Sequence, residues 1–413
     1  MTSSASTHPS PAEPLRVAFL VEELGRSGGM GQVRRYARHV GGTLVVCGAK
    51  PGALPAEDDG IPVTGLEQAG PVDVAVATWW TTAERLFEID AARRVAFLQN
   101  LEHRFYLEDE RMDRLGALGV LDLPVDFVVI ASHMREVLER LRPEARVRVV
   151  SAGIDKRVFT PRPAPAGDGP LRVLVEGQPT LWFKGMADAV AAVRAMREPA
   201  TLTLAVHDPA DARSAGLDAD RVVGGLAPEG MARLYAEHDV LLKLPRFEGL
   251  ALPPLEAMHV GRPCVLTPFT GSEDYARHGE NALVVGFDDG PGATAALDLL
   301  ARDAGLRRRL SEGALRTAAA WPDDEAAAAG FAAALHDFSA EPPPPPAGSH
   351  QRLARSRRLA IEIAREGQRR DAVALDHSQI DTAKLAARLD DITSRRSYRA
   401  ARAVKRVLRR GGS

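Results

Sequence analysis

Short apolar runs alternate with longer segments of helical spacing along most of the chain. Such runs suit strands that are buried on both faces of a sheet, and a helical segment follows most of them. We expect strands at 15–24, 43–47, 71–78, 93–100, 126–132, the first part of 146–163, 171–177, 201–208, 239–244 and 264–268. This alternation predicts an α/β fold with parallel sheets and crossover helices.

The alternation is interrupted once, at the Pro/Gly-rich segment 163–170. A chain of 413 residues is long enough for two domains of ordinary size, each with its own core. We therefore expect one Rossmann-like domain over 15–165 and a second over 166–340.

The two ends of the chain differ from the main body in composition. Residues 1–14 lack a basic region followed by an apolar core, so they indicate a disordered N-terminus and no signal peptide. Residues 341–349 form a proline-rich linker, and 350–413 indicate a basic helical tail.

Charge is distributed unevenly between body and tail. Residues 351–413 hold 17 Lys and Arg against 7 Asp and Glu, whereas 1–350 hold 36 against 48. Because the body is acidic, nucleic acid is not an expected partner of it. Residues 395–410 contain eight basic residues and a narrow apolar stripe, which suits an anionic membrane surface. A solvated tail, or one that binds a partner or nucleic acid, fits as well.

The cysteine content and hydropathy bear on location. Cys47 and Cys264 lie in apolar runs, which favours two small buried hydrophobic side chains over ligands or nucleophiles. No apolar run approaches the roughly 20 residues that span a bilayer. We expect a cytoplasmic protein, with peripheral attachment to the inner face of the cell membrane through the tail.

The candidate chemistry gathers in the segment 239–268, where an apolar strand, a short loop and a helix follow one another. Glu248 lies on the loop, and Gly249, Leu250 and Ala251 place backbone N–H groups just before the helix. In α/β sheets this is where anionic ligands bind. Glu256 falls in the first turns of the helix, so that both carboxylates could face one crevice.

The run EGLALPPLEAM resembles the signature of the retaining glycosyltransferases of family 4, which have the GT-B fold; Ala251 stands where glycine is common. The resemblance covers about residues 15–340. It implies two Rossmann-like domains that face a cleft; the C-terminal helical extension lies outside the resemblance and is predicted from its composition. It also implies a UDP-, GDP- or dTDP-sugar donor, a glycan, lipid-linked or small-molecule acceptor, retention of configuration, and no metal or cofactor.

The resemblance implies roles for residues of the second domain. Glu256 would accept hydrogen bonds from the ribose hydroxyls, and Glu248 would face the donor sugar. Lys184 and the N–H groups of the loop would hold the diphosphate. The family's second phosphate cation, an arginine, is replaced here by Gln178.

Further donor contacts are implied at two places, and one more helix is implied at the end of the second domain. Val223, with its neighbours in 222–224, would lie against the base. Gly271 and Ser272 would contact the sugar, although Ser272 could equally cap a helix. The segment 322–338 would be the last helix, which packs back onto the first domain.

The first domain departs further from the family pattern. Its glycine-rich loop supplies Gly28, Gly29 and Gly31 as cleft-lining candidates, although a tight turn would also explain them. A histidine–aspartate pair that touches the donor sugar in many family members is replaced by Gln99 and Asn100. Asn100 and His103 are therefore the candidates for assisting the transfer.

The run of residues 98–106 also resembles a rhamnosyltransferase-like subgroup, which favours a deoxyhexose donor such as dTDP-rhamnose. Two other functions remain open. A GT-B sugar-nucleotide epimerase would share the fold and need no acceptor. A catalytically silent scaffold that acts through its tail would explain Gln178 and the altered pair.

Overall fold

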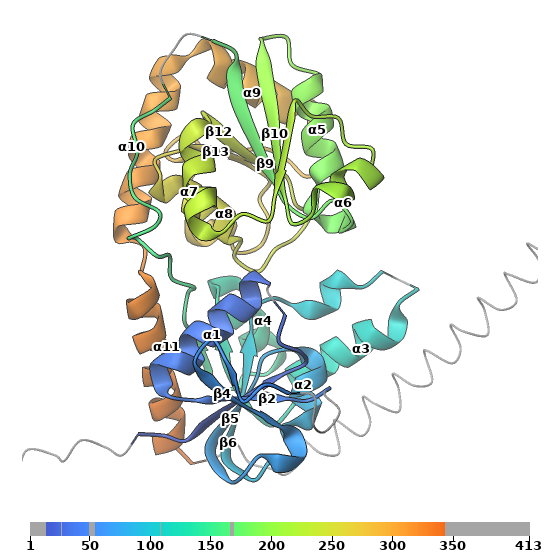
Figure 1. The fold of residues 1–413 in the computed structure, drawn as a ribbon, viewed down its shortest axis with the longest axis vertical. Coiled ribbons are helices and arrows are strands. Elements are labelled where there is room, and N and C mark those ends of the chain that lie inside the picture. The colour runs from blue at the N-terminus through green and yellow to red at the C-terminus, as the bar shows by residue number, and fades with distance from the viewer. Residues whose placement is uncertain (1–13, 26, 49–53, 108, 166–168, 343–413) are drawn as a thin grey trace, which may run out of the picture.

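The computed structural model describes residues 14–25, 27–48, 54–107, 109–165 and 169–342. They form two lobes, each built on a largely parallel sheet flanked by helices (Figure 1). This is the predicted α/β architecture. The predicted N-terminal segment before residue 14, the linker after residue 342 and the basic tail lie outside the described residues.

The sheet of the first lobe has the order β3-β4-β2-β1-β5-β6-β7-β8, and β3 alone pairs antiparallel. The central strand β1 is buried at all five positions, as its apolar run predicts. The strands are β1 (Val17–Val21), β2 (Thr43–Val46), β3 (Glu57–Asp58), β4 (Ile61–Gly65), β5 (Val72–Ala77), β6 (Ala91–Leu98), β7 (Asp126–Val129) and β8 (Val147–Val149).

The helices of the first lobe are α1 (Gly28–Val40), α2 (Trp80–Arg85), α3 (Arg111–Gly119) and α4 (Ser132–Leu141), with the 3₁₀ turns η1 (Leu66–Gln68), η2 (Glu102–Phe105) and η3 (Val120–Asp122). α1 begins where Ser27 accepts a hydrogen bond from the N–H of Met30 at 3.2 Å. It ends at Gly41, which has a φ of 63°. The glycine-rich segment thus forms the first turn of this helix.

The second sheet is parallel throughout, with the order β11-β10-β9-β12-β13-β14. Its strands are β9 (Leu171–Glu176), β10 (Ala200–Val206), β11 (Arg221–Gly224), β12 (Val240–Lys243), β13 (Cys264–Leu266) and β14 (Ala282–Val284). The flanking helices are α5 (Met186–Arg194), α6 (Pro209–Ser214), α7 (Pro228–Glu237), α8 (Leu252–His259), α9 (Gly290–Arg302) and α10 (Ala304–Ala320), with η4 (Trp182–Lys184) and η5 (Ser272–Asp274).

The last described helix, α11 (Asp324–Ala340), crosses back to the first lobe and lies along its sheet (Figure 1). Phe331 of α11 stacks on Tyr36 at 4.4 Å and on Phe19 at 5.8 Å between ring centroids. Aromatic pairs at these separations stabilise the contact beyond the area that they bury. The final helix therefore joins the two lobes, as the resemblance implies.

The two cysteines occupy different environments. Cys264 is fully buried in β13, and burial raises the pKa of its thiol well above the ordinary value. Cys47 is only partly buried, and its pKa is raised to about 12 by burial. Neither thiol is activated as a nucleophile.

Among the helices of the described residues, none is long and apolar enough to cross a bilayer.

Candidate functional site

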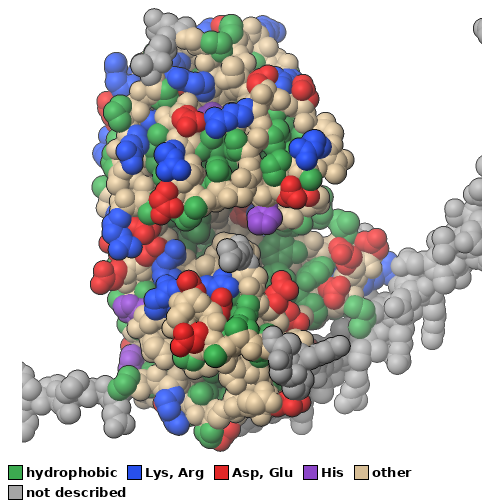
Figure 2. All heavy atoms as spheres, in the orientation of Figure 1, with side chains coloured by type: hydrophobic (Ala, Val, Ile, Leu, Met, Phe, Trp, Pro, Cys, Tyr) green, Lys and Arg blue, Asp and Glu red, His purple; other side chains and the backbone are tan. Residues whose placement is uncertain are grey.

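The signature loop lies where the two lobes meet. β12 ends at Lys243, α8 begins at Leu252, and the loop between them reaches the first lobe. A Cβ built on Gly249 would lie 2.0 Å from the carbonyl oxygen of Gln99, which follows β6. Only glycine permits this approach. The space-filling view shows a hollow with apolar side chains in its walls between the lobes (Figure 2).

Charged side chains from three elements of the second lobe meet at Glu248. Its Oε1 accepts a hydrogen bond from Lys184 Nζ at 2.8 Å and lies 3.8 Å from Lys243 Nζ. Lys243 also donates to Oε2 of Glu176 at 2.6 Å. Glu248 is buried, and these cations offset the unfavourable burial of its carboxylate.

The loop after Glu248 presents backbone donors that the protein does not use. Within the part of the chain that the structure describes, the N–H groups of Gly249, Leu250 and Ala251 donate no hydrogen bond to another protein group. Gly249 and Leu250 are buried. Because buried N–H groups are almost always paired, these donors indicate a place for an anionic ligand.

The helix after the loop offers fewer N–H groups to a ligand than the sequence suggests. α8 carries proline at 253 and 254 in its first turn, and these residues have no N–H to offer. The expected helix N-terminus is therefore largely replaced by the loop amides. Ala251, directly before α8, has a φ of 59°, in the region that favours glycine. This strain lies at the position of the signature where glycine is common and this chain has alanine.

Glu256 lies in α8, partly buried, and accepts a hydrogen bond from the hydroxyl of Tyr235 at 3.0 Å. Burial raises the pKa of Glu256 to about 7, against the lowering effect of Tyr235, Lys243 and Arg35. Lys243 is near enough to Glu256, Glu248 and Glu176 for all three carboxylates to raise its pKa. The two glutamates of the signature therefore lie around the same lysine.

The first lobe faces this loop with the residues that follow β6. Asn100 is buried, and its Oδ1 accepts from the N–H of Leu101 at 2.8 Å. Burial, with Arg104 and Arg114, lowers the pKa of His103 to about 4, so the imidazole is neutral near pH 7. A neutral imidazole can accept a proton from a hydroxyl group.

Glu102 is a buried carboxyl in the same turn, within the run 98–106 that the sequence analysis describes only as a whole. Its Oε2 accepts from the N–H of Trp80 at 2.7 Å, and burial raises its pKa to about 8. It anchors the start of α2 to η2. In the sequence, the one feature that marks Glu102 is its position directly before His103.

The three glycines of the first loop are not equivalent. Gly28, Gly29 and Gly31 all lie in the first turn of α1. A Cβ on Gly29 would lie 3.1 Å from Oε1 of Gln99, whereas one on Gly28 or Gly31 would meet nothing within 4 Å. The structure thus brings Gly29 toward the signature loop through Gln99.

The loop after β13 packs directly on the signature loop. Gly271 has a φ of 97°, and a Cβ there would lie 2.1 Å from the carbonyl oxygen of Gly249. Ser272 donates its hydroxyl proton to the carbonyl of Phe269 at 2.6 Å. The suggested capping role of Ser272 is wrong, because Gly271 holds the cap position of η5.

Two residues that were predicted to contact the sugar-nucleotide donor lie outside the group of charged side chains around Glu248. Gln178 is exposed on the loop after β9. Val223 lies in β11, the edge strand of the second sheet and the third strand from β12. Three strand spacings amount to roughly 14 Å, so Val223 does not contact the charged group at the end of β12.

Hydrogen bonds that the sequence analysis did not predict fasten the lobes together beside this site. Arg104 donates to the hydroxyl of Thr270 at 2.9 Å. The N–H of Ser132, at the start of α4, donates to Oδ2 of Asp274 at 2.9 Å, and its hydroxyl donates to Oδ1. Asp274 therefore places a carboxylate from the second lobe at a helix N-terminus of the first.

Aromatic rings from both lobes pack beside Lys184. Phe105 of η2 lies 5.2 Å from Phe183 and 5.7 Å from Phe247, and it stacks on Trp79 at 5.7 Å. The ammonium of Lys184 lies 5.5 Å from the centre of the Phe183 ring. This apolar wall excludes water from one side of the charged group, which strengthens its electrostatic interactions.

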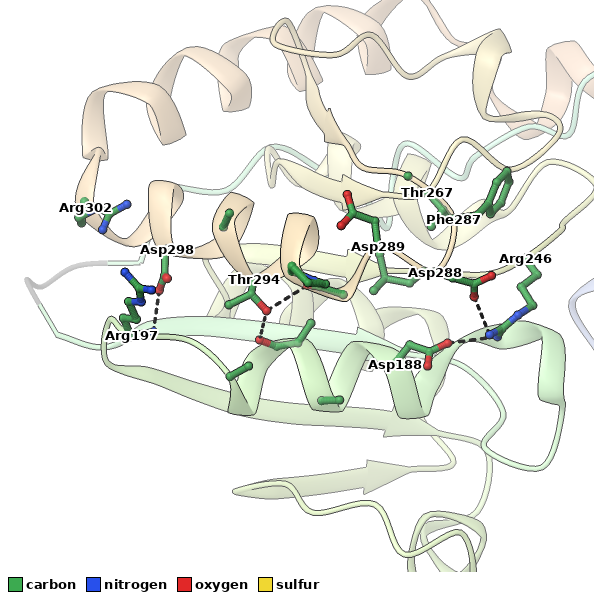
Figure 3. Close-up of a pocket in the computed structure, with 18 residues that line it drawn as sticks. Asp188, Arg197, Arg246, Thr267, Phe287, Asp288, Asp289, Thr294, Asp298 and Arg302 are labelled. Carbon is green, nitrogen blue, oxygen red and sulfur yellow. Dashed lines mark hydrogen bonds and ion pairs between the residues drawn. The ribbon is translucent and has the colours of Figure 1, made fainter.

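A separate cavity of about 760 Å³ runs between α5 and α9 (Figure 3). At one end Arg246 pairs with Asp188 at 3.1 Å and with Asp288 at 2.7 Å. At the other end Asp298 accepts hydrogen bonds from the N–H groups of 197 and 198. Because Arg246 is paired with two carboxylates and Asp298 is bonded to backbone, we assign the chemistry to the lobe interface and not to this cavity.

No metal-binding group was found in the part of the chain that the structure describes: three or more His, Cys, Asp or Glu side chains do not converge anywhere in it. The carboxylates of the charged group are each paired with lysine or tyrosine.

The chain is similar to known proteins in sequence and in fold. Residues 172–303 match the family model described as glycosyl transferases group 1. Over 254 residues the chain is 26% identical to an MMP alpha-(1->4)-mannosyltransferase of Mycolicibacterium hassiacum, a match that covers 60% of this chain and 57% of that protein.

Two solved structures have the same fold. Sucrose-phosphate synthase of Thermosynechococcus elongatus matches with a TM-score of 0.67 at 16% identity, over 79% of this chain and 100% of that one. Alr3699/HepE of Anabaena, solved in complex with UDP-glucose, matches with a TM-score of 0.65 at 14% identity, over 78% of this chain and 100% of that one. The predicted GT-B fold is thereby confirmed.

Proposed function

We propose that the protein is a glycosyltransferase that moves a sugar from a nucleotide-sugar donor to a hydroxyl group of an acceptor. The observation that carries the proposal is the set of unpaired loop amides at 249–251, beside Lys184 and Glu248 and between two lobes of GT-B fold. The family match over 172–303 supports it, because this range contains the whole signature.

The donor would be held mainly by the second lobe. The loop N–H groups and Lys184 bind the diphosphate, since an ammonium acts on phosphate as a point charge. Glu256 accepts hydrogen bonds from the ribose hydroxyls. Val223 lies against the base in this proposal. We propose a UDP-, GDP- or dTDP-sugar; the deoxyhexose alternative rests on the sequence of 98–106 alone.

The transfer step depends on charge that develops as the glycosidic bond breaks. Electrons of that bond leave with the diphosphate, whose added negative charge is stabilised by the loop amides and Lys184. The sugar becomes positively charged, and Glu248 faces it as an ionised carboxylate and not as a covalent nucleophile. The acceptor hydroxyl then attacks the sugar carbon, with retention of configuration, and its proton passes to the neutral imidazole of His103.

The acceptor would approach from the first lobe. The neutral imidazole of His103 and the amide of Asn100 are the groups proposed to assist its hydroxyl. We propose a glycan, lipid-linked or small-molecule acceptor. Protein cations and amides take the place of a metal here, so chelation should leave turnover unchanged, and recovery of lost turnover by Mn²⁺ or Mg²⁺ would refute this part.

A thermal-shift screen over UDP-, GDP-, ADP- and dTDP-sugars tests the proposal. A donor at 100 times its Kd should stabilise the protein by about 2.7 kcal/mol. The same donor should give little shift with Glu256→Ala. Transfer is then measured with an acceptor panel, and the anomeric configuration of the product is read by NMR. If none of these donors stabilises the protein or is consumed, the proposal fails.

The proposal includes a cytoplasmic location with peripheral membrane attachment. It rests on the eight basic residues of 395–410. Full-length protein should co-sediment with vesicles that contain anionic lipid, and a chain shortened by residues 395–413 should not. Equal sedimentation of both would exclude this attachment.

A further inference from the structure

Lys243 is a buried cation in the middle of a sheet. Its side chain is 2% exposed, at the end of β12 and beside β9. Its Nζ donates to Oε2 of Glu176 at 2.6 Å and to the backbone oxygen of Glu176 at 3.2 Å. Burial of an ammonium is unfavourable unless it is paired, so an apolar residue would suit this strand better for stability alone.

The second partner of Lys243 is Glu248, at 3.8 Å from Oε1. The same oxygen accepts a hydrogen bond from Lys184 at 2.8 Å. The two lysines differ in how freely their side chains can move. The side chain of Lys184 is 21% exposed and rises from the short turn η4, whereas Lys243 is fixed by the sheet and by Glu176.

A donor diphosphate would compete with Glu248 for Lys184. Two phosphate groups attract the ammonium more strongly than one carboxylate does, and Lys184 is the cation that can move. Glu248 would then remain buried with Lys243 as its cation. Without Lys243 the carboxylate would be buried without a cation, which is unfavourable, so it would turn away and no longer face the sugar.

We propose that Lys243 is a positioning residue, which holds Glu248 in place as an anion when the donor draws Lys184 to its diphosphate. Glu176 in turn fixes Lys243. This inference rests on the proposed function and adds a role for two residues outside the family signature.

The charge state of Lys243 agrees with this role. Burial by itself lowers the pKa of Lys243, but the carboxylates of Glu176, Glu248 and Glu256 raise it above its ordinary value. The side chain is therefore an ammonium at neutral pH. An uncharged amine could not keep a carboxylate ionised.

Lys243 does not serve as the diphosphate cation that is absent at Gln178. Its Nζ is enclosed between Glu176 and Glu248, whereas a phosphate ligand must be reachable from the hollow between the lobes. The two roles differ in their kinetic effect, because a diphosphate ligand contributes to donor affinity and a positioning residue contributes to the transfer step.

The test compares Lys243→Met, Lys243→Met with Glu176→Gln, and Lys184→Met. The double variant leaves no unpaired carboxylate at 176, so it should fold if the single variant does not. With both Lys243 variants we expect kcat to fall about 10- to 100-fold, the range seen when a supporting residue of a site is removed, and donor Kd to stay within about threefold. With Lys184→Met we expect donor Kd to weaken about tenfold or more.

Each outcome has one meaning. Wild-type protein that neither binds nor consumes any donor overturns the proposed function and this inference with it. Wild-type turnover together with unchanged kcat in the Lys243 variants overturns the inference alone. It is also overturned if those variants lose donor affinity as strongly as Lys184→Met, or if both fail to fold. A donor-bound crystal structure should show Glu248 on Lys243 and Lys184 on the diphosphate.

Discussion

Gly249 in the second lobe lies against the carbonyl oxygen of Gln99 in the first, and a Cβ at position 249 would come within 2.0 Å of that oxygen. Both partners are backbone, so no side-chain rotation can relieve the clash. The signature loop can therefore lie this close to the first lobe only because position 249 has no side chain.

Gly249→Ala should separate the loop from Gln99. We expect transfer activity to fall about 10- to 100-fold, because a shift of about 1 Å in reacting groups is enough for such a loss. Gly119→Ala is the control, since a Cβ there meets nothing within 4 Å. It should leave activity unchanged and raise stability by up to about 1 kcal/mol. Equal activity of the two variants would show that the Gln99 contact does not matter.

A second contact between the lobes is made by Asp274, which accepts hydrogen bonds from Ser132 at the start of α4. Asp274→Asn should cost about 1 kcal/mol through the weakened cap, and it should open the lobes on average. Small-angle scattering measures the opening as a larger radius of gyration.

The matched control for this variant is Asp303→Asn. Asp303 caps α10 within the second lobe, through the N–H of Leu306 at 2.8 Å. Because asparagine also caps helices, the substitution should cost less than about 1 kcal/mol, through the lost charge alone, and leave the radius of gyration unchanged. If Asp274→Asn also leaves the radius unchanged, Ser132 and Asp274 stabilise the fold without controlling closure.

Local features of the site could be predicted from the sequence. The strand, loop and helix of 239–268 follow from an apolar run, a polar turn and two prolines, all close together in the chain. The carboxylates at 248 and 256 were therefore placed correctly on loop and helix. The alternative that Ser272 caps a helix was wrong, because its hydroxyl proton goes to the carbonyl of Phe269 and Gly271 holds the cap position.

Distant pairings could not be predicted in this way. The burial of Lys243 depends on Glu176, 67 positions earlier, and Ser132 and Asp274 are 142 positions apart. Nothing in the local pattern around these residues specifies a partner. The strand Ile61–Gly65 was missed for another reason: it is partly exposed and contains proline, so it lacks the continuous apolar run of a central strand.

Ala251 provides a test of local strain. Its φ of 59° is unfavourable for a residue with a Cβ, and glycine would adopt it freely. Ala251→Gly should raise the free energy of unfolding by about 0.5–2 kcal/mol, after the entropy that glycine adds to the unfolded chain is subtracted. Urea denaturation measures this.

The same substitution at Ala257 in α8 is the control for that effect. Ala257 is helical and buried, so Ala257→Gly should lower stability by about 1 kcal/mol or more. A loss of stability in both variants would mean that the backbone at 251 is not strained.

Glu256 should make stability depend on pH. Its pKa is about 7 in the folded protein, raised from 4.5 by burial, so the folded state binds more protons than the unfolded state between these values. Stability from this group is thus fully present below about pH 4.5 and is lost as pH rises through about 7. The loss amounts to at most about 3 kcal/mol.

Glu256→Gln removes the titration and keeps an oxygen that can accept from Tyr235. We expect the variant to match the wild type near pH 5 and to melt at a higher temperature near pH 8, where the wild type must bury a charge. Melting curves across this range are the measurement, and parallel curves for both proteins would contradict the expectation.

Donor binding should change with pH in the opposite sense. The wild type should gain donor affinity as pH rises through about 7, because the carboxylate of Glu256 accepts hydrogen bonds from both ribose hydroxyls. The Glu256→Gln variant should show no such gain.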